Sequence, residues 1–163
     1  MGYTTEFSGS FFLDKPLTEA QRIFLADFAG SRRIRWVRNL LPIDPVVEAA
    51  GLKGDDPRFY TKGGTNPYDH RQIEDSNNPP ADQPGLWCQW VPSDDGTRIE
   101  WDGGEKFYKY TEWLKYIVET FLKPWGLSLT GVAEWQGEES SDVGKLIVRG
   151  NIVTTKVGRV VYD

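Results

Sequence analysis

The stretch QPGLWCQWVPSDDGTRIEWDGGEKFYKYTEWLKYIVETFLKPW, residues 83–125, decides the fold that this sequence predicts. It combines an aromatic β-hairpin, a Gly-Gly junction and a long amphipathic segment. Between residues 105 and 123, apolar residues recur at spacings of three and four, as in Phe107, Tyr110, Leu114, Ile117 and Phe121. This period is typical of a helix with one buried face. We therefore expect a helix over 105–123, with Asp102 as its N-cap and Pro124 as its stop.

The hairpin precedes this helix. Residues 86–91 and 97–101 predict two short strands, and the Asp and Gly residues of 92–96 suit a turn closed at positive φ. Thr97, Ile99 and Trp101 alternate with charged residues. The second strand is therefore expected to have one buried and one solvent-facing side.

The N-terminal part predicts one strand and two helices. Residues 3–13 alternate with the period of a strand, and TEAQ at 18–21 has the form of a capping box. A helix is expected over 19–29, burying Ala20, Ile23, Phe24 and Phe28. A second, short helix is expected over 45–51, with Asp44 as its cap.

The C-terminal part predicts strands only. Residues 127–136 alternate, 145–149 and 152–156 flank a two-residue Gly-Asn turn, and 159–162 predict a final edge strand. The expected fold is α+β, an antiparallel sheet with two main helices on one face. Its split β-α-β-like order carries an added C-terminal hairpin. We expect a single domain over 1–163 with a long irregular loop at about 52–84.

The composition of the chain limits the kinds of binding partner that we expect. The net charge of −5 and the pI near 5.0 argue against general nucleic-acid binding, which needs basic surface. One cysteine, Cys88, and the absence of an apolar N-terminal run predict a reducing cytoplasm, and no apolar segment is long enough for a membrane span. No metal or cofactor motif is present, so no cofactor is expected, and the oligomeric state stays open.

Catalytic candidates are few. The only histidine is His70, and a Cys88–His70 pair is less favoured than packing of Cys88 in an apolar strand. Glu100 with Asp102, or Asp94 with Asp95, could serve as paired carboxylates, but turn and capping roles explain both pairs. The sequence therefore favours a binding protein over an enzyme without deciding the question.

An arginine cluster is the main binding candidate. Four arginines within residues 32–38 flank Trp36, and Tyr60 and Tyr68 follow in the irregular loop. Guanidinium groups match phosphate oxygens and aromatic faces stack on bases, although such arginines can also neutralise an acidic protein's own surface. The predicted ligand-binding residues are Arg32, Arg33, Arg35, Trp36, Tyr60, Trp87 and Trp101.

Several motifs carry a family resemblance that covers most of the chain. They are MGYTTEF at 1–7, LDKPLT at 13–18, QPGLWCQW at 83–90, EWDGGEKFY at 100–108 and EWQG at 134–137. With these motifs the chain resembles an uncharacterised family of short phage and bacterial proteins. The resemblance implies a small soluble protein of mobile elements that acts by binding or sequestration, and it fixes no site residue.

These observations lead to one hypothesis and two alternatives. The hypothesis is a non-enzymatic protein that sequesters a small phosphorylated or nucleotide-like ligand. The first alternative is an inhibitor that binds a host or defence protein through the same aromatic and arginine side chains, which suit interface hot spots. The second alternative is a carboxylate-dependent hydrolase using Glu100 and Asp102.

Overall fold

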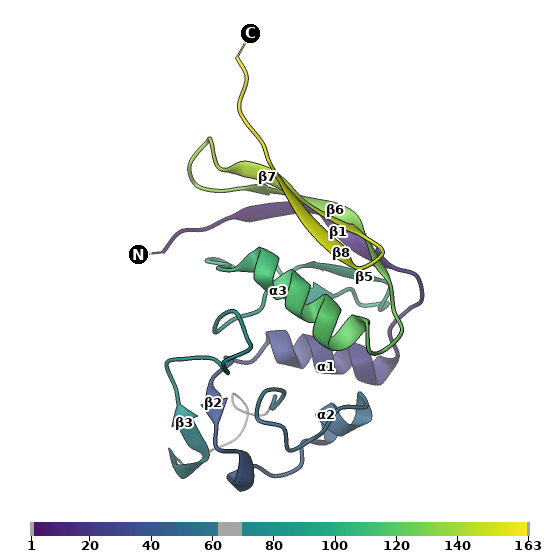
Figure 1. Cartoon of the computed structure of the whole chain (residues 1–163), viewed down its shortest axis with the longest axis vertical. Helices are drawn as coiled ribbons and strands as arrows, with labels where there is room; N and C mark the ends of the chain where they lie inside the picture. The colour runs from purple at the N-terminus through teal and green to yellow at the C-terminus, as the bar shows by residue number, and fades with distance from the viewer. Residues whose placement is uncertain (1, 62–69, 163) are drawn as a thin grey trace. The chain divides into compact units, whose positions relative to one another are not determined.

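The computed structural model describes residues 2–61 and 70–162, and the chain divides into two compact units (Figure 1). The sheet unit comprises Met1–Pro16 and Gln89–Asp163, and the inserted unit comprises Leu17–Cys88. The single domain over 1–163 stays a prediction.

The sheet unit contains one antiparallel sheet of six strands in the order β4-β5-β1-β6-β7-β8. The neighbours β6-β1-β5-β4 reproduce the predicted split order, and β7 and β8 form the added C-terminal hairpin. The α+β class is thus confirmed. The strands are β1 (Glu6–Leu13), β4 (Trp90–Pro92), β5 (Arg98–Trp101), β6 (Leu129–Gln136), β7 (Val143–Arg149) and β8 (Ile152–Val157).

The two faces of this sheet differ in burial. On the inner face, Phe11 lies opposite Ile99, Ala133 lies opposite Leu146, and all four side chains are buried. The helix α3 (Tyr110–Ile117) lies along this face (Figure 1), and the Phe7 and Tyr110 rings are 5.0 Å apart. The outer face alternates with the inner one and carries exposed side chains.

The predicted start of the helix over 105–123 is wrong, because the helix begins later in the chain. α3 begins at Tyr110 and continues into a π-helical turn, Val118–Leu122, just before Pro124. Asp102 does not cap it, because its Oδ1 accepts the amide of Gly104 at 2.8 Å within its own turn. The residue before the helix is Lys109, at φ 59°. Phe107 is buried in an irregular segment, so its position in the apolar pattern was wrongly interpreted as the first turn of the helix.

Two strand predictions also need correction. β4 begins at Trp90 instead of residue 86, and its ladder with β5 spans three residue pairs. Residues 159–162 form no strand, since the ladder bonds with β7 end where the amide of Gly158 donates to the carbonyl of Val143. The Gly150-Asn151 turn is confirmed, with φ of 52° and 71°.

The inserted unit holds α1 (Glu19–Ala29), whose capping box is confirmed, and α2 (Pro45–Ala49), which is capped by Asp44 as predicted. Ile23 was predicted to be buried but is exposed and lines an apolar hollow between α1 and α2. The remaining elements are the 3-10 turns Arg38–Leu40 and His70–Gln72 and the strands β2 (Arg35–Trp36) and β3 (Ile73–Asp75).

The pairing of β2 with β3 was not predicted, and it gives part of the 52–84 segment regular structure. Ile34, Trp36 and Leu41 form a small core there, against which Tyr60, Ile73 and Leu86 pack. Among the described residues, no helix has the length and apolar character needed to cross a bilayer.

Candidate functional site

Arg33, predicted to bind phosphate, is buried in the inserted unit, with 2% of its surface exposed. Its Nη1 donates to the carbonyl of Arg58 at 3.2 Å, and its Nη2 donates to the carbonyl of Tyr60 at 2.6 Å and to the Ser31 hydroxyl. The guanidinium carbon lies 4.2 Å from the centroid of the Phe28 ring. These contacts give Arg33 a structural role.

Its neighbours make contacts of the same kind. Arg32 Nε donates to the carbonyl of Ser76 at 3.3 Å, and Arg35 Nε donates to the carbonyl of Pro79 at 2.6 Å. We call Arg32, Arg33 and Arg35 the arginine clamp, because each binds main-chain oxygen of the irregular 52–84 segment. An irregular backbone has few ladder partners, and its carbonyl groups need other donors when they leave water.

The predicted stacking residues are scattered. Trp36 is 4% exposed and its ring lies 5.0 Å from that of Tyr60, whereas Trp87 is 46% exposed. Trp101 belongs to the sheet unit, where its Nε1 donates to Gln89 Oε1 at 3.1 Å. Tyr68 lies outside the described residues. The structure thus brings Arg33, Trp36 and Tyr60 together, and ligand contact by any of the seven residues stays a prediction.

The catalytic candidates Glu100, Asp102 and Cys88 also have structural surroundings that the structure describes. Glu100 lies 4.0 Å from Arg98 Nη2, and burial raises the pKa of Asp102 although the Gly104 amide opposes that shift. Cys88 is fully buried but lies outside any strand. Within residues 2–61 and 70–162, no three His, Cys, Asp or Glu side chains are placed to hold a metal ion.

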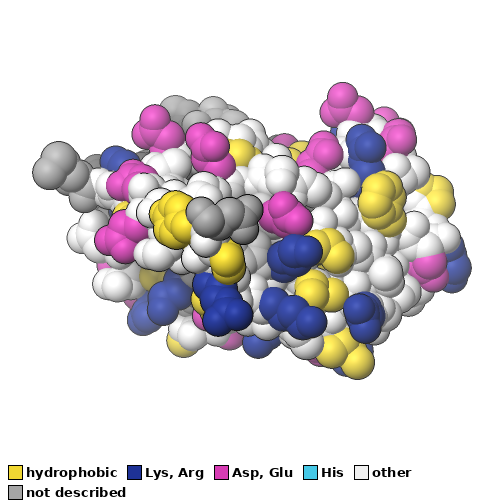
Figure 2. All heavy atoms as spheres, turned by 90° about the horizontal axis from the view of Figure 1, so that it is seen from above, with side chains coloured by type: hydrophobic (Ala, Val, Ile, Leu, Met, Phe, Trp, Pro, Cys, Tyr) yellow, Lys and Arg dark blue, Asp and Glu magenta, His cyan; other side chains and the backbone are white. Residues whose placement is uncertain are grey.

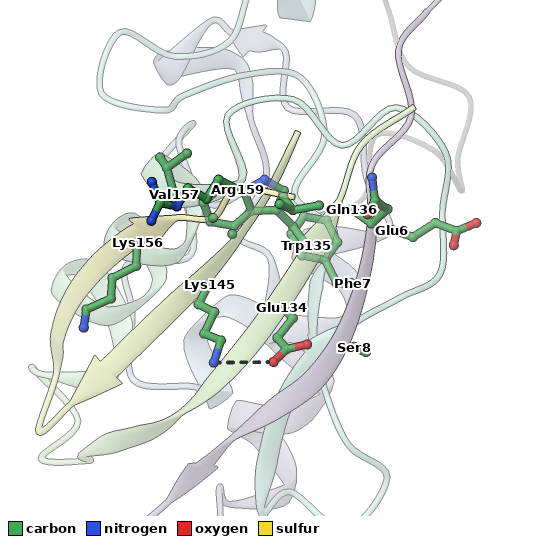
Figure 3. A pocket seen from close by; sticks show the side chains of 13 residues that line it. Glu6, Phe7, Ser8, Glu134, Trp135, Gln136, Lys145, Lys156, Val157 and Arg159 are labelled. Carbon is green, nitrogen blue, oxygen red and sulfur yellow. Dashed lines mark ion pairs between the residues drawn. The ribbon is translucent and has the colours of Figure 1, made fainter. Parts of the chain in front are cut away.

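The sequence-based prediction missed a hollow of about 520 Å³ at one end of the sheet (Figure 3). We call it the sheet hollow. It is lined by one end of β1, β6, β7 and β8 and by the segment that follows β8. A row of directly paired outer-face residues crosses it, formed by Ser8, Glu134, Lys145 and Lys156.

The electrostatics of the sheet hollow are unbalanced. Lys145 Nζ lies 3.7 Å from a Glu134 oxygen (Figure 3), but Lys156 stands directly opposite Lys145 on the next strand. Like charges at opposed positions destabilise a strand pair. Lys156 and Arg159 make no ion pair with any described residue, and Glu6 points away from the Lys145–Glu134 pair (Figure 3).

Figure 2 shows Lys and Arg side chains gathered beside hydrophobic ones on the face seen from above, with Asp and Glu side chains elsewhere on the same face. The hairpin register could have revealed the lysine pair from sequence. Residues 145 and 156 are equally distant from the Gly150-Asn151 turn, so a two-residue turn places them opposite each other.

Comparison with family models, curated proteins and solved structures gives no match for this chain. The resemblance to short phage and bacterial proteins therefore stays a prediction.

Proposed function

We propose that this chain is a non-enzymatic binding protein that holds a small phosphorylated anion in the sheet hollow. The observation that carries the proposal is the opposed Lys145–Lys156 pair with Arg159 beside it. The proposal keeps the ligand class that the sequence suggests and moves the site from the inserted unit to the sheet unit.

Charge supports an anionic ligand. Three cations line the sheet hollow, and one of them, Lys145, is partly neutralised by Glu134. An anion placed between Lys145 and Lys156 relieves their mutual repulsion, so binding gains free energy that a neutral ligand does not gain. Arg159 adds a planar fork of donors that matches phosphate oxygens.

Size and lining also fit. A volume of about 520 Å³ lies within the range of small-molecule sites. Ser8 lies in the same row as the two lysines and offers a hydroxyl, and Val157 provides an apolar wall. The arrangement can bind and orient an anion. With the buried Cys88 it suits a protein of the reducing cytoplasm.

The test is titration of the whole protein with inorganic pyrophosphate and with AMP, ADP and ATP at low salt, followed by NMR amide shifts. We expect shifts at residues 143–145 and 156–159. The double variant Lys156→Ala/Arg159→Ala should weaken the affinity at least about tenfold, since two charge-assisted contacts are lost.

The matched control is Arg149→Ala. Arg149 is an exposed cation of the same face, four residues from Lys145 along β7 and so about 13 Å away. It should leave the affinity unchanged. Arg32→Ala tests the site that the sequence predicted. Loss of binding in Arg32→Ala with full binding in the double variant would return the site to the arginine clamp.

A protein-binding inhibitor is the second candidate function. The outer face carries exposed apolar side chains outside the sheet hollow, at Phe12, Val132 and Ile152. If none of the anions binds at millimolar concentration, the small-ligand proposal fails and this candidate remains.

A further inference from the structure

The two edges of the sheet differ. β4 is three residues long and ends in Pro92, which has no amide hydrogen to offer a further strand. β8 spans six residues, IVTTKV, without proline, and five of the six are exposed, namely four β-branched residues and Lys156. Native edges are normally short, charged or covered. Among the residues of β8, only Lys156 supplies a charge that protects the edge.

The register shows which backbone groups of β8 have no ladder partner. The amide of Gly158 donates to the carbonyl of Val143 at 2.8 Å. In an antiparallel ladder every second residue pair is hydrogen-bonded in this way, counted here from the Val143–Gly158 pair. The main-chain groups of Ile152, Thr154 and Lys156 therefore face β7. Those of Val153, Thr155 and Val157 face outward, and Val157 is 81% exposed.

We propose that β8 pairs antiparallel with β8 of a second copy of this chain, in a register centred on Thr155. Val153 then lies opposite Val157 of the second copy, and Thr155 lies opposite its own equivalent. All three outward-facing residues of each strand form ladder pairs, and two six-stranded sheets become one continuous sheet. The proposal lies beyond the proposed function and does not rest on it.

Charge selects this register over its neighbours. With Thr155 on the two-fold axis, Lys156 lies opposite Thr154 of the second copy, and no like charges meet. A shift that puts Lys156 on the axis sets it opposite its own equivalent, which is destabilising. The shift that puts Thr154 on the axis sets Val157 opposite Asn151, a residue of the hairpin turn at φ 71°. If the register shifts by one residue pair, the outward-facing main-chain groups of one strand lie opposite residues of the second copy whose own groups face β7, and the ladder bonds cannot form.

The side chains near the axis suit such a pairing. Val–Val and Thr–Thr are favourable cross-strand pairs on one face of a sheet. The opposite face of β8 carries Ile152, which is 67% exposed and gains cover from the added strand. The edge is therefore self-complementary in hydrogen bonding, shape and charge.

Cysteine cross-linking tests both the association and its register. In Thr155→Cys, the two cysteine Cα atoms lie about 5.5 Å apart across the axis, within the range of a disulfide. We expect a covalent dimer under mild oxidation. The native Cys88 is fully buried and gives no background.

The matched control is Thr154→Cys, which is also exposed and adjacent in sequence. Its two copies lie about 8 Å apart in this register, too far for a disulfide, so it should stay monomeric. Cross-linking of Thr154→Cys in place of Thr155→Cys would overturn the register. Equal cross-linking of both would indicate random collision and overturn the proposal.

Sedimentation velocity of the unmodified protein gives the second readout. We expect a dimer at about 100 µM, where mass action populates weak assemblies. Thr155→Pro removes one outward amide and should yield a monomer with an unchanged far-UV circular dichroism spectrum. A wild-type protein that stays monomeric at this concentration and shows no Thr155→Cys dimer refutes the pairing.

Discussion

Arg33 provides the sharpest test of the structural role of the arginine clamp. We predict that Arg33→Met strongly destabilises the inserted unit. Methionine retains much of the aliphatic stem that packs in this position but removes the guanidinium donors. The carbonyl of Tyr60, 2.6 Å from Arg33 Nη2, then loses its donor, and the carbonyl of Arg58 loses the bond at 3.2 Å but keeps the one from Gln83 Nε2 at 2.6 Å.

The magnitude follows from these contacts. The Tyr60 carbonyl is left without its donor, which costs about 1–3 kcal/mol, and loss of one of the two bonds to the Arg58 carbonyl costs about 1 kcal/mol more. The contact of the guanidinium with the Phe28 ring, at 4.2 Å, adds about 1 kcal/mol. Relief from burying a charge offsets part of this loss. We expect a net destabilisation of about 3 kcal/mol.

Hydrogen exchange measures this loss where it occurs. The amide of Phe59 donates to the carbonyl of Asp56 at 3.1 Å, and the amide of Thr61 donates to Asp44 Oδ2 at 3.0 Å, so both report opening of the segment. A loss of about 3 kcal/mol accelerates their exchange about 100-fold. The control is Arg32→Met, because Arg32 is exposed and makes one long bond, at 3.3 Å. It should change exchange less than about threefold.

An unchanged exchange rate in Arg33→Met would refute the reasoning. The two carbonyl groups would then be satisfied without the guanidinium, and Arg33 would again be available for the ligand contact that the sequence suggests.

Three further outcomes are expected. Hydrogen bonds, of which the one from the Thr97 side chain has the largest effect, lower the pKa of Asp95 to about 2. The ionised carboxylate therefore stabilises the β4–β5 turn fully above pH 3.8, and this stabilisation is lost as the pH falls to about 2. Asp95→Asn should therefore lower the Tm at pH 6 but not near pH 2, as thermal scans across pH will show. Gly131→Ala should cost at least about 2 kcal/mol in urea unfolding, since its Cβ would meet the Cα of Phe11 at 2.8 Å, and a smaller cost would mean that β1 and β6 can separate easily. Lys109→Gly should stabilise the protein by about 1 kcal/mol in the same assay, because φ is 59° there, and a loss of stability would show that the side chain matters more than the backbone.

Local signals predicted the elements whose causes are local. The capping box at Thr18 and Gln21 fixed the start of α1, and the Gly150-Asn151 turn fixed the register of β7 and β8. The start of α3 was predicted wrongly, because apolar spacing reports burial and Phe107 is buried without being helical.

The candidate site was less predictable for a physical reason. An arginine presents the same donors to a phosphate and to a carbonyl group, and only distance between segments decides which it meets. Arg33 meets carbonyl groups 25 and 27 residues further along the chain. The sheet hollow is lined by four strands from both ends of the sequence, so composition could not reveal it.

The sequence by itself determined the α+β class, the split strand order with its C-terminal hairpin, and the turns and caps, because periodicity, capping residues and glycine conformations act over a few neighbouring residues. Only the tertiary structure decided that the arginine clamp binds backbone of the 52–84 segment. It also decided that Lys145 and Lys156 meet beside Arg159 in a hollow and that β8 remains an open edge. These features depend on which distant segments pair, and pairing is set by the burial of the whole chain.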